Sequence, residues 1–247
     1  MQPNNFRIIT ALLIVIGIIA GSLVVRSAYI YKFRQQETIS VTGAAEHNFV
    51  ADLIVWSGTY SKNAMDLKEA YAALKQDEQK VRNYLQSKGV NPNDLVTSAV
   101  STEKLFEYQH DENGRQTGAT FAGYRLQQTV KVQSKEIEKV EKISREITEL
   151  IENGVELTSA EPQYFYTRLS ELKIDLLAKA SADGKIRAGT IAQHAGNKLG
   201  TLQKAQMGIF QIIGQNTNED YSYGGAFNTS SKNKTATITI KMEFAAN

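Results

Sequence analysis

The chain has 247 residues, with 28 Lys and Arg against 26 Asp and Glu, and it contains no cysteine. The absence of cysteine excludes disulfides, thiol nucleophiles, thiolate metal sites and a lipid-modified cysteine. The first 34 residues hold four basic groups and no acid, so the remainder is close to neutral. A near-neutral domain lacks the clustered basic face of a nucleic-acid binder, and we expect no nucleic-acid partner.

An apolar segment near the N-terminus is the first element along the chain. The segment from Ile8 to Val25 follows Arg7 and contains no charged residue. It is long enough to cross a bilayer as a helix. A cleaved signal peptide is the alternative, with Ala20-Gly21-Ser22 as the small-residue cleavage site. We favour an uncleaved transmembrane anchor, because the apolar run continues through Val25 beyond that site. We therefore expect the main domain to be extracytoplasmic, periplasmic or on the cell surface, and secreted if the segment is cleaved.

The domain organisation follows from this anchor. Residues 1–37 are predicted to form a short tail, a membrane-spanning helix (8–25) and a juxtamembrane linker, and residues 38–247 a single α+β domain. Apolar periods that switch between two and about 3.6 residues predict the elements of that domain. Strands are expected at 38–45, 49–60, 95–108, 120–133, 155–166, 202–213 and 236–244, and helices at 64–88, 137–151 and 167–199, with Ser134 as a helix cap and a polar loop at 215–232.

Hairpins and alternating strands dominate this pattern. Asn113-Gly114 supplies the positive-φ residues of a turn between the strands at 95–108 and 120–133. The final strand alternates apolar and polar residues without interruption, as expected for a sheet with one buried face. The fold class is therefore α+β: a largely antiparallel sheet with packed helices, one of which is long and rich in Ala and Gly.

The long helix at 167–199 carries a small residue at every fourth position. The row is Ala180, Gly184, Ala188, Ala192 and Gly196, and it continues to Gly200. Residues four apart share one helix face, so another backbone can approach this face closely. Two interpretations remain open: the helix lies on the sheet of its own chain, or the row is a contact between subunits of a homo-oligomer.

Three stretches together resemble the SIMPL-domain family. They are Ile39-Ser-Val-Thr-Gly-Ala-Ala-Glu46 with Ala51-Asp52, Gly123 to Val132, and the helix from Ala178 to Gly200. The resemblance covers about residues 38–246, although Ala45 and Ala51 replace a glycine and a proline usual in the family. It implies an exported or envelope-associated α+β protein, since bacterial members include immunogenic proteins and a protein linked to oxidative-stress defence. It carries over no catalytic residue.

Within the resemblance, Val41, Thr42, Gly43 and Gly200 match a structural signature rather than a reactive one. Gly43 is expected to permit a close approach or a bulge in its strand. Gly200 is expected to form a left-handed turn after the long helix.

A search for catalytic chemistry finds little. His47, His110 and His194 are the only histidines, and none has a second ligand at the spacing of a zinc site. No phosphate-binding loop, dinucleotide fingerprint or serine nucleophile motif is present, so we expect no catalytic residue, cofactor or metal. An aromatic loop with Tyr221, Tyr223 and Phe227 is either flexible or an adaptable contact surface for a partner.

Two functional classes remain. The leading hypothesis is a membrane-anchored, non-enzymatic envelope protein that self-associates, with a stress-tolerance role implied by the family resemblance alone. The alternative is a small-molecule binding or hydrolytic domain in which carboxylates such as Asp52 and Glu161 meet in a cleft. Converging acids in a cavity would distinguish the second class from the first.

Overall fold

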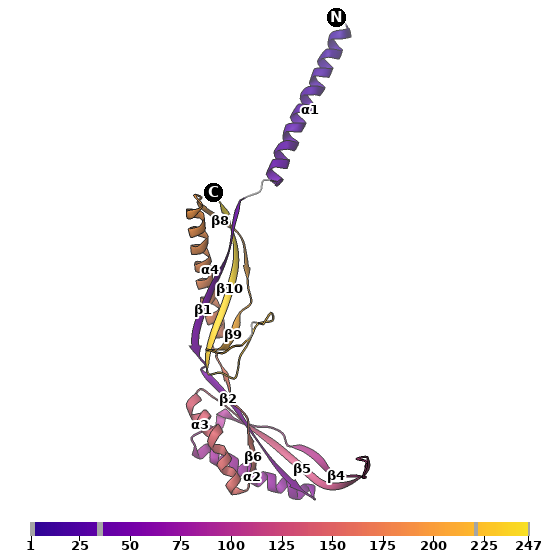
Figure 1. Ribbon diagram of the computed structural model, residues 1–247, viewed down its shortest axis with the longest axis vertical. Coiled ribbons are helices and arrows are strands. Elements are labelled where there is room, and N and C mark those ends of the chain that lie inside the picture. Colours follow the sequence, from indigo (N-terminus) through magenta and orange to yellow (C-terminus); the bar gives the residue numbers. More distant parts are fainter. Residues whose placement is uncertain (1–2, 34–36, 220–221, 247) are drawn as a thin grey trace. The chain divides into compact units, whose positions relative to one another are not determined.

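A computed structural model describes residues 3–33, 37–219 and 222–246. The fold is α+β, with two antiparallel sheets and four α-helices in the described residues (Figure 1). The chain divides into two compact units, and we call them the first unit (residues 1–43, 184–206 and 241–247) and the second unit (44–183 and 207–240). The elements β1, α4 and β10 each contribute residues to both units.

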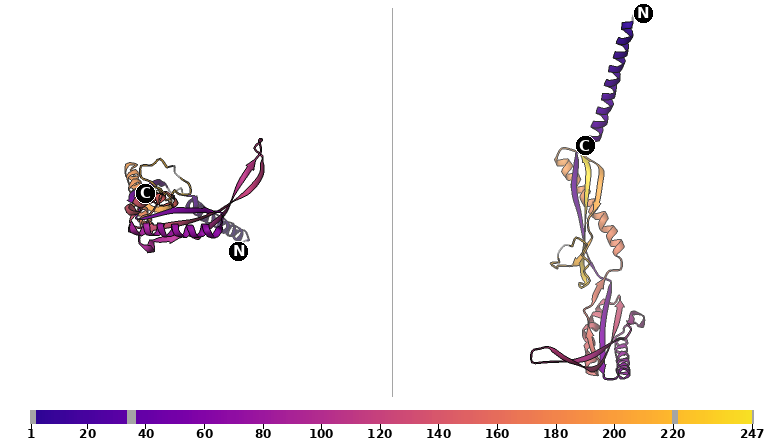
Figure 2. Two further views of the ribbon diagram at one scale, coloured as in Figure 1. Left: turned by 90° about the horizontal axis from the view of Figure 1, so that it is seen from below. Right: turned by 90° about the vertical axis from the view of Figure 1, so that its right-hand side faces the viewer.

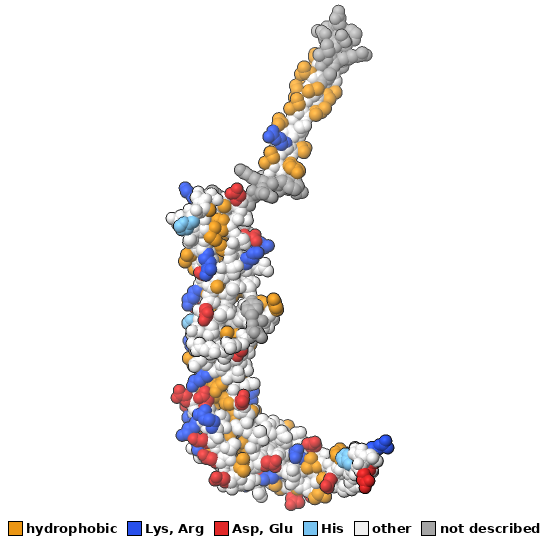
Figure 3. Space-filling model, viewed as in Figure 1, with side chains coloured by type: hydrophobic (Ala, Val, Ile, Leu, Met, Phe, Trp, Pro, Cys, Tyr) orange, Lys and Arg blue, Asp and Glu red, His pale blue; other side chains and the backbone are white. Residues whose placement is uncertain are grey.

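The first helix, α1 (Pro3–Phe33), is longer than the sequence indicated. Its segment Leu12–Ile30 has the length and hydropathy of a membrane span, and none of it is buried in the protein. Figure 3 shows orange apolar side chains along its described part. The same criteria are also met by signal sequences near an N-terminus, so the segment is a signal sequence or an anchor.

The larger sheet lies in the second unit and has the strand order β3-β5-β2-β6, with β4 added to β5 and β7 added to β2. The bounds are β2 (Leu53–Ala64), β3 (Leu95–Thr97), β4 (Ser101–His110), β5 (Gln116–Ser134), β6 (Glu156–Ser159) and β7 (Gln163–Phe165). The central pair is long, since β2 and β5 align from Ile54↔Ser134 to Ala64↔Tyr124.

Helix α2 (Leu67–Ser87), helix α3 (Ile137–Glu146) and the 3-10 helix η2 (Ile147–Asn153) pack on this sheet and close its core. Trp56 and Tyr60 from β2 are almost completely buried, together with Leu74 and Leu85 from α2. The side chain of Asp66 begins α2, because it accepts hydrogen bonds from the backbone N–H groups of Lys68 and Glu69. The helix predicted at 64–88 thus supplies part of this core.

The smaller sheet has the order β1-β10-β8, with β9 paired to β10. Its strands are β1 (Thr38–Val50), β8 (Leu199–Met207), β9 (Gln211–Gly214) and β10 (Asn233–Ala246), and α4 (Leu169–His194) is the accompanying helix. The alternating residues predicted for the last strand are buried in β10: Ala236, Ile238, Ile240, Met242 and Phe244. The antiparallel α+β architecture expected from the sequence is confirmed.

Several element boundaries differ from the predictions. The strand β1 continues through His47 to Val50, and the turn to β2 lies at Ala51-Asp52. The predicted strands at 155–166 and 202–213 are each divided in two, as β6 with β7 and as β8 with β9. Ser134 is not the N-cap of α3, which is Glu136; the hydroxyl of Ser134 instead accepts a hydrogen bond from the Glu136 backbone.

Candidate interaction surfaces

The small-residue row of α4 faces the interior of its own chain. Ala180, Ala188 and Ala192 are buried almost completely, and Gly184 is buried as well. A Cβ atom on Gly184 would lie 3.3 Å from the Cα atom of Gly43 in β1 and would collide with the Met242 side chain of β10. The row therefore lies against the protein's own sheet. Its buried residues are not exposed for the alternative, a contact between subunits.

The last two glycines of the row have different roles from those expected. Gly196 is exposed, has a φ of 80° and follows the end of α4 at His194. Its left-handed conformation terminates the helix, a role that the sequence assigned to Gly200. Gly200 instead lies within β8, so the prediction of a left-handed turn there was wrong. The close approach at Gly43 agrees with the expectation for that residue.

Val41 and Thr42, the signature residues next to Gly43, lie in β1 of the first unit. Val41 is buried, and Thr42 is exposed on the opposite face of β1. Both line a recess of about 460 Å³ beside the exposed side chains of Ile186 and Ile191 on α4. The helix side of this recess carries Arg187 and Thr190 beside the two isoleucines, and the strand side carries the polar Ser40 and Thr42.

The aromatic loop before β10 is held by a buried amide. Tyr221 lies outside the described residues, whereas Tyr223 and Phe227 are exposed. Gln211 of β9 donates to the carbonyl of Ser222 at 2.7 Å and accepts from the backbone N–H of Ala226 at 3.0 Å. These hydrogen bonds order the backbone between the two aromatic residues, so this part of the loop presents them on a defined framework.

A buried lysine secures the end of the same loop. Lys234 of β10 is 2% exposed and donates to the backbone carbonyl and to the side-chain oxygen of Asn228. Burial lowers the pKa of the Lys234 ammonium to about 8, and the Glu219 carboxylate acts in the opposite direction. The side-chain amide of Asn228 in turn donates to the Glu219 carboxylate, so the two ends of the loop are joined by a hydrogen bond.

The two carboxylates proposed for a hydrolytic cleft do not line a common cavity. Asp52 lines a cavity of about 660 Å³ together with Glu136 and Glu138, and Glu161 does not line it. Both oxygens of Asp52 accept hydrogen bonds from Thr167, one from its backbone N–H and one from its hydroxyl, each at 2.7 Å. Asp52 thereby connects the β1–β2 turn to the segment that precedes α4. Glu161 is exposed between β6 and β7 and lines neither of the two cavities around the start of α3.

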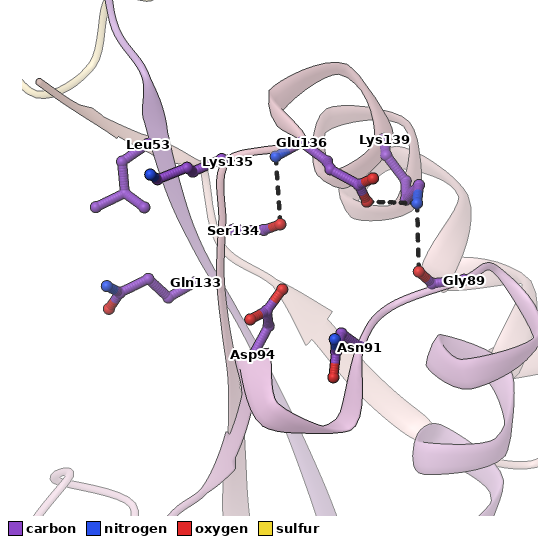
Figure 4. Close-up of a pocket in the computed structure, with 9 residues that line it drawn as sticks. All are labelled: Leu53, Gly89, Asn91, Asp94, Gln133, Ser134, Lys135, Glu136 and Lys139. Atoms are coloured by element: carbon purple, nitrogen blue, oxygen red, sulfur yellow. Dashed lines mark hydrogen bonds and ion pairs between the residues drawn. The ribbon is translucent and has the colours of Figure 1, made fainter. Parts of the chain in front are cut away.

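The first of these cavities has a volume of about 570 Å³ and lies between β5, the α2–β3 connection and the start of α3 (Figure 4). Two of its charged groups, Lys139 and Glu136, form an ion pair. Lys139 also donates to the carbonyl of Gly89, and Asp94 approaches from the opposite side. Within the described residues, no group of three or more His, Asp or Glu side chains could hold a metal ion. His47, His110 and His194 are all exposed.

The most exposed feature of the second unit is the hairpin of β4 and the first part of β5. Figures 1 and 2 show it extending as a two-stranded arm beyond the rest of this unit. β4 pairs with β5 alone, and residues 116–123 of β5 pair with β4 alone, in the described part of the chain. Both edges of the arm therefore present unpaired backbone groups.

One face of this arm is aromatic. Phe106 is 44% exposed and Tyr108 is 55% exposed, and Phe106 meets the ring of Phe121 edge-on at 5.9 Å. Phe121 makes a similar contact with Tyr124 at 5.1 Å. The sequence located the turn but missed this surface. A signal was present in the sequence, because Phe106 and Tyr108 flank Glu107 in a strand with few apolar residues.

The arm leaves the sheet at a bulge. Residues Leu105 and Phe106 oppose Gly123 and Phe121, so Ala122 is an extra residue in β5. Gly123 has a φ of 116°, and a Cβ atom there would lie 2.6 Å from the carbonyl oxygen of Ala64. Since Tyr124↔Ala64 is the last aligned pair of β5 and β2, the bulge marks the point where the arm begins.

The model of the SIMPL family, described as a protein of unknown function (DUF541), matches residues 39–244. The chain therefore belongs to the SIMPL family, and the family description assigns no activity to it. A separate search of curated proteins found no match.

Proposed function

We propose that the protein is a membrane-anchored, extracytoplasmic, non-enzymatic component of the cell envelope that associates with further copies of itself through the β4–β5 arm. The observation that carries this proposal is the exposed aromatic arm with two unpaired edges. A two-stranded hairpin is at best marginally stable in water when it stands alone. A partner that covers the aromatic face of the arm and pairs with one of its free edges would add the stability that the isolated hairpin lacks.

A second copy of the chain fits the edge of β4. In an antiparallel pairing about a two-fold axis through Phe106, the two Phe106 residues stand opposite each other. Lys104 of each copy then faces Tyr108 of the other, an arrangement that favours cation–aromatic contact. A register centred one residue earlier, on Leu105, would place Glu103 opposite Glu107 and repel. The charges of β4 therefore favour one symmetric register.

The other parts of the proposal have separate support. The length and hydropathy of Leu12–Ile30 support anchoring, and the basic residues near it support a position at the membrane surface. Membership of the SIMPL family supports the envelope location, and the resemblance to stress-linked members supports a contribution to oxidative or envelope stress tolerance. Asp52 is engaged by Thr167, which favours a non-enzymatic role over the hydrolytic alternative.

The test is the mass in solution of the full chain in detergent micelles, measured by light scattering coupled to gel filtration at several concentrations. We expect a discrete multimer, and a smaller species when Phe106→Ala and Tyr108→Ala are combined. Ile174→Ala is the matched control, because Ile174 is exposed on α4 away from the arm. A monomer at every concentration, or equal effects of the control and the arm variant, would contradict the proposal.

A covalent test addresses the identity of the partner. Because the chain has no cysteine, Phe106→Cys introduces the only thiol. The symmetric register predicts a disulfide-linked dimer under mild oxidation, whereas Ile174→Cys should remain monomeric. Failure of Phe106→Cys to cross-link in a sample that light scattering shows to be multimeric would move the interface away from β4.

A further inference from the structure

The two units of the chain carry opposite net charges, although the whole chain is close to neutral. The first unit holds nine Lys and Arg against two Asp and Glu, and the second unit holds 19 against 24. The asymmetry persists when the N-terminal 37 residues are left out of the first unit. Five basic residues then stand against Glu243, and all five are exposed: Lys185, Arg187, Lys198, Lys204 and Lys241.

The longest acid-free stretch of the folded domain begins in α4. From Gly184 to Asn218 there is no Asp or Glu, while Lys185, Arg187, Lys198 and Lys204 occur in it. His194 lies at the end of α4 within the same stretch and is exposed. The part of this stretch that belongs to the first unit, residues 184–206, therefore carries only positive formal charges.

The same end of the first unit is tied to α1. Helix α1 ends at Phe33 and β1 begins at Thr38, so the start of β1 lies within roughly 15–20 Å of the end of α1 by chain length alone. The backbone N–H of Ala246 donates to the carbonyl of Glu37 at 2.7 Å, which brings the end of β10 to this point. Figures 1 and 2 show the C-terminal end of α4 and the start of β8 at this end as well.

Exposed apolar side chains accompany the positive charges. Ile186 is 68% exposed and Ile191 is 48% exposed on α4, where they border the recess against β1. Figure 3 shows apolar side chains between basic side chains over this part of the domain. Apolar groups flanked by cations are the composition of segments that lie in the headgroup region of a bilayer.

We propose that the surface from Ile186 to Lys198 lies on the bilayer that holds α1 and binds the phosphate groups of anionic lipids. Lys198 and His194 contact lipid phosphates, and Ile186 and Ile191 enter the headgroup region. This inference rests on the proposed anchoring by α1, which confines the surface to the neighbourhood of the membrane. Each basic residue within a Debye length of an anionic surface strengthens the contact roughly fivefold.

The test uses the full chain reconstituted into vesicles of phosphatidylcholine alone or with about 30 mol % phosphatidylglycerol. A fluorophore on Gln193→Cys, the only thiol in the chain, reports contact through quenching by lipids with a nitroxide headgroup. We expect at least about twofold stronger quenching in the anionic vesicles, and its loss in about 0.5 M salt.

Variants distinguish binding of anionic lipids by this particular surface from attraction of the whole protein's net charge to the membrane. Lys198→Glu, and Ile186→Ser combined with Ile191→Ser, should each reduce the quenching in anionic vesicles to the level in neutral ones. Lys131→Glu makes the same charge change at an exposed residue of β5 in the second unit and should leave the quenching unchanged. Equal losses in Lys198→Glu and Lys131→Glu would overturn the proposal, because they would indicate net charge alone.

Flotation of the same samples distinguishes this inference from the proposed function. If the chain floats with both vesicle types but the quenching is equal in them, the lipid-binding surface is wrong and the anchoring stands. If the chain floats with neither, the anchoring fails and the lipid-binding surface fails with it. Flotation together with lipid-dependent quenching supports both.

Discussion

At the scale of single residues, the contact between Gly184 and Gly43 decides how α4 lies on its sheet. We expect Gly184→Val to destabilise the protein by about 1–3 kcal/mol, because the added carbons overlap Gly43 and Met242. The matched change Gly189→Val should be nearly neutral, because the nearest atom to a Cβ there is 4.0 Å away. Urea denaturation of the three proteins measures both effects, and similar losses in the two variants would refute the packing argument.

The buried Lys234 predicts a pH dependence of stability. Its pKa is lowered to about 8 in the folded protein, from 10.5 in the unfolded chain. Between these values the unfolded state binds more protons, so the free energy of unfolding rises with pH from about 8 to 10.5. The gain is at most about 3 kcal/mol.

The variant Lys234→Met isolates this contribution. It removes the titrating group, so its free energy of unfolding should lack the rise that the wild-type protein shows over the same interval. Its absolute stability should fall, because Asn228 loses the donor to its backbone carbonyl. Parallel curves for the two proteins across this pH interval would show that Lys234 does not titrate there.

At the scale of elements, the bulge at Gly123 sets where the arm leaves the sheet. Gly123→Ala places a Cβ atom 2.6 Å from the Ala64 carbonyl oxygen in a backbone region that L-residues rarely adopt. We expect a loss of stability of about 1–3 kcal/mol, measured by thermal or urea unfolding. Gly118→Ala in the same strand is the control, since its nearest neighbour is the flexible Gln109 side chain at 3.4 Å. A larger loss in the control than in Gly123→Ala would contradict this role for the bulge.

The arm itself is expected to be the least protected part of the larger sheet. It lacks buried apolar side chains, so the amides of β4 should exchange with solvent faster than those of β2. Assembly through β4 should slow this exchange in the multimer and leave β2 unchanged. Hydrogen exchange followed by mass spectrometry, at concentrations below and above assembly, measures the difference; unchanged exchange in β4 on assembly would exclude it from the interface.

At the scale of the whole molecule, the fate of the N-terminal segment determines where the domain resides. We expect the mass of the native protein isolated from membranes to include residues 1–37, because the apolar segment extends to Ile30, beyond the small residues at 20–22. Intact-protein mass spectrometry makes the measurement. A native mass that begins after residue 22 would identify a cleaved signal peptide and remove the anchor from both proposals.

The charge division also belongs to the whole molecule. The net charge of the sequence outside the first 34 residues is almost zero. The order of charged residues along the chain did not indicate a basic face. The fold brings residues 38–43, 184–206 and 241–247 into one unit and leaves most acids in the other. The charge difference between the two units therefore became visible only after distant segments were placed together.

The sequence by itself determined the features that depend on local periodicity. The apolar run of α1, the helix α2, the turn at Asn113-Gly114 and the alternation of β10 each depend on residues close together in the sequence. Each was predicted near its observed position. The boundaries were less accurate, as at β1 and β8, because strand ends depend on partners elsewhere in the chain. The α+β class and the SIMPL family followed from the order of these local patterns.

The tertiary structure alone decided which of these patterns face outward. The spacing of the small residues from Ala180 to Ala192 is the same for a contact with another subunit and for a contact with the chain's own β1 and β10. Only the packing in the structure shows that these residues are buried within the chain. Phe106 and Tyr108 lie in the strand predicted at 95–108, and apart from β5 no element of the described chain pairs with that part of it. Burial is a property of contacts between residues far apart in sequence, and local periodicity therefore cannot specify it.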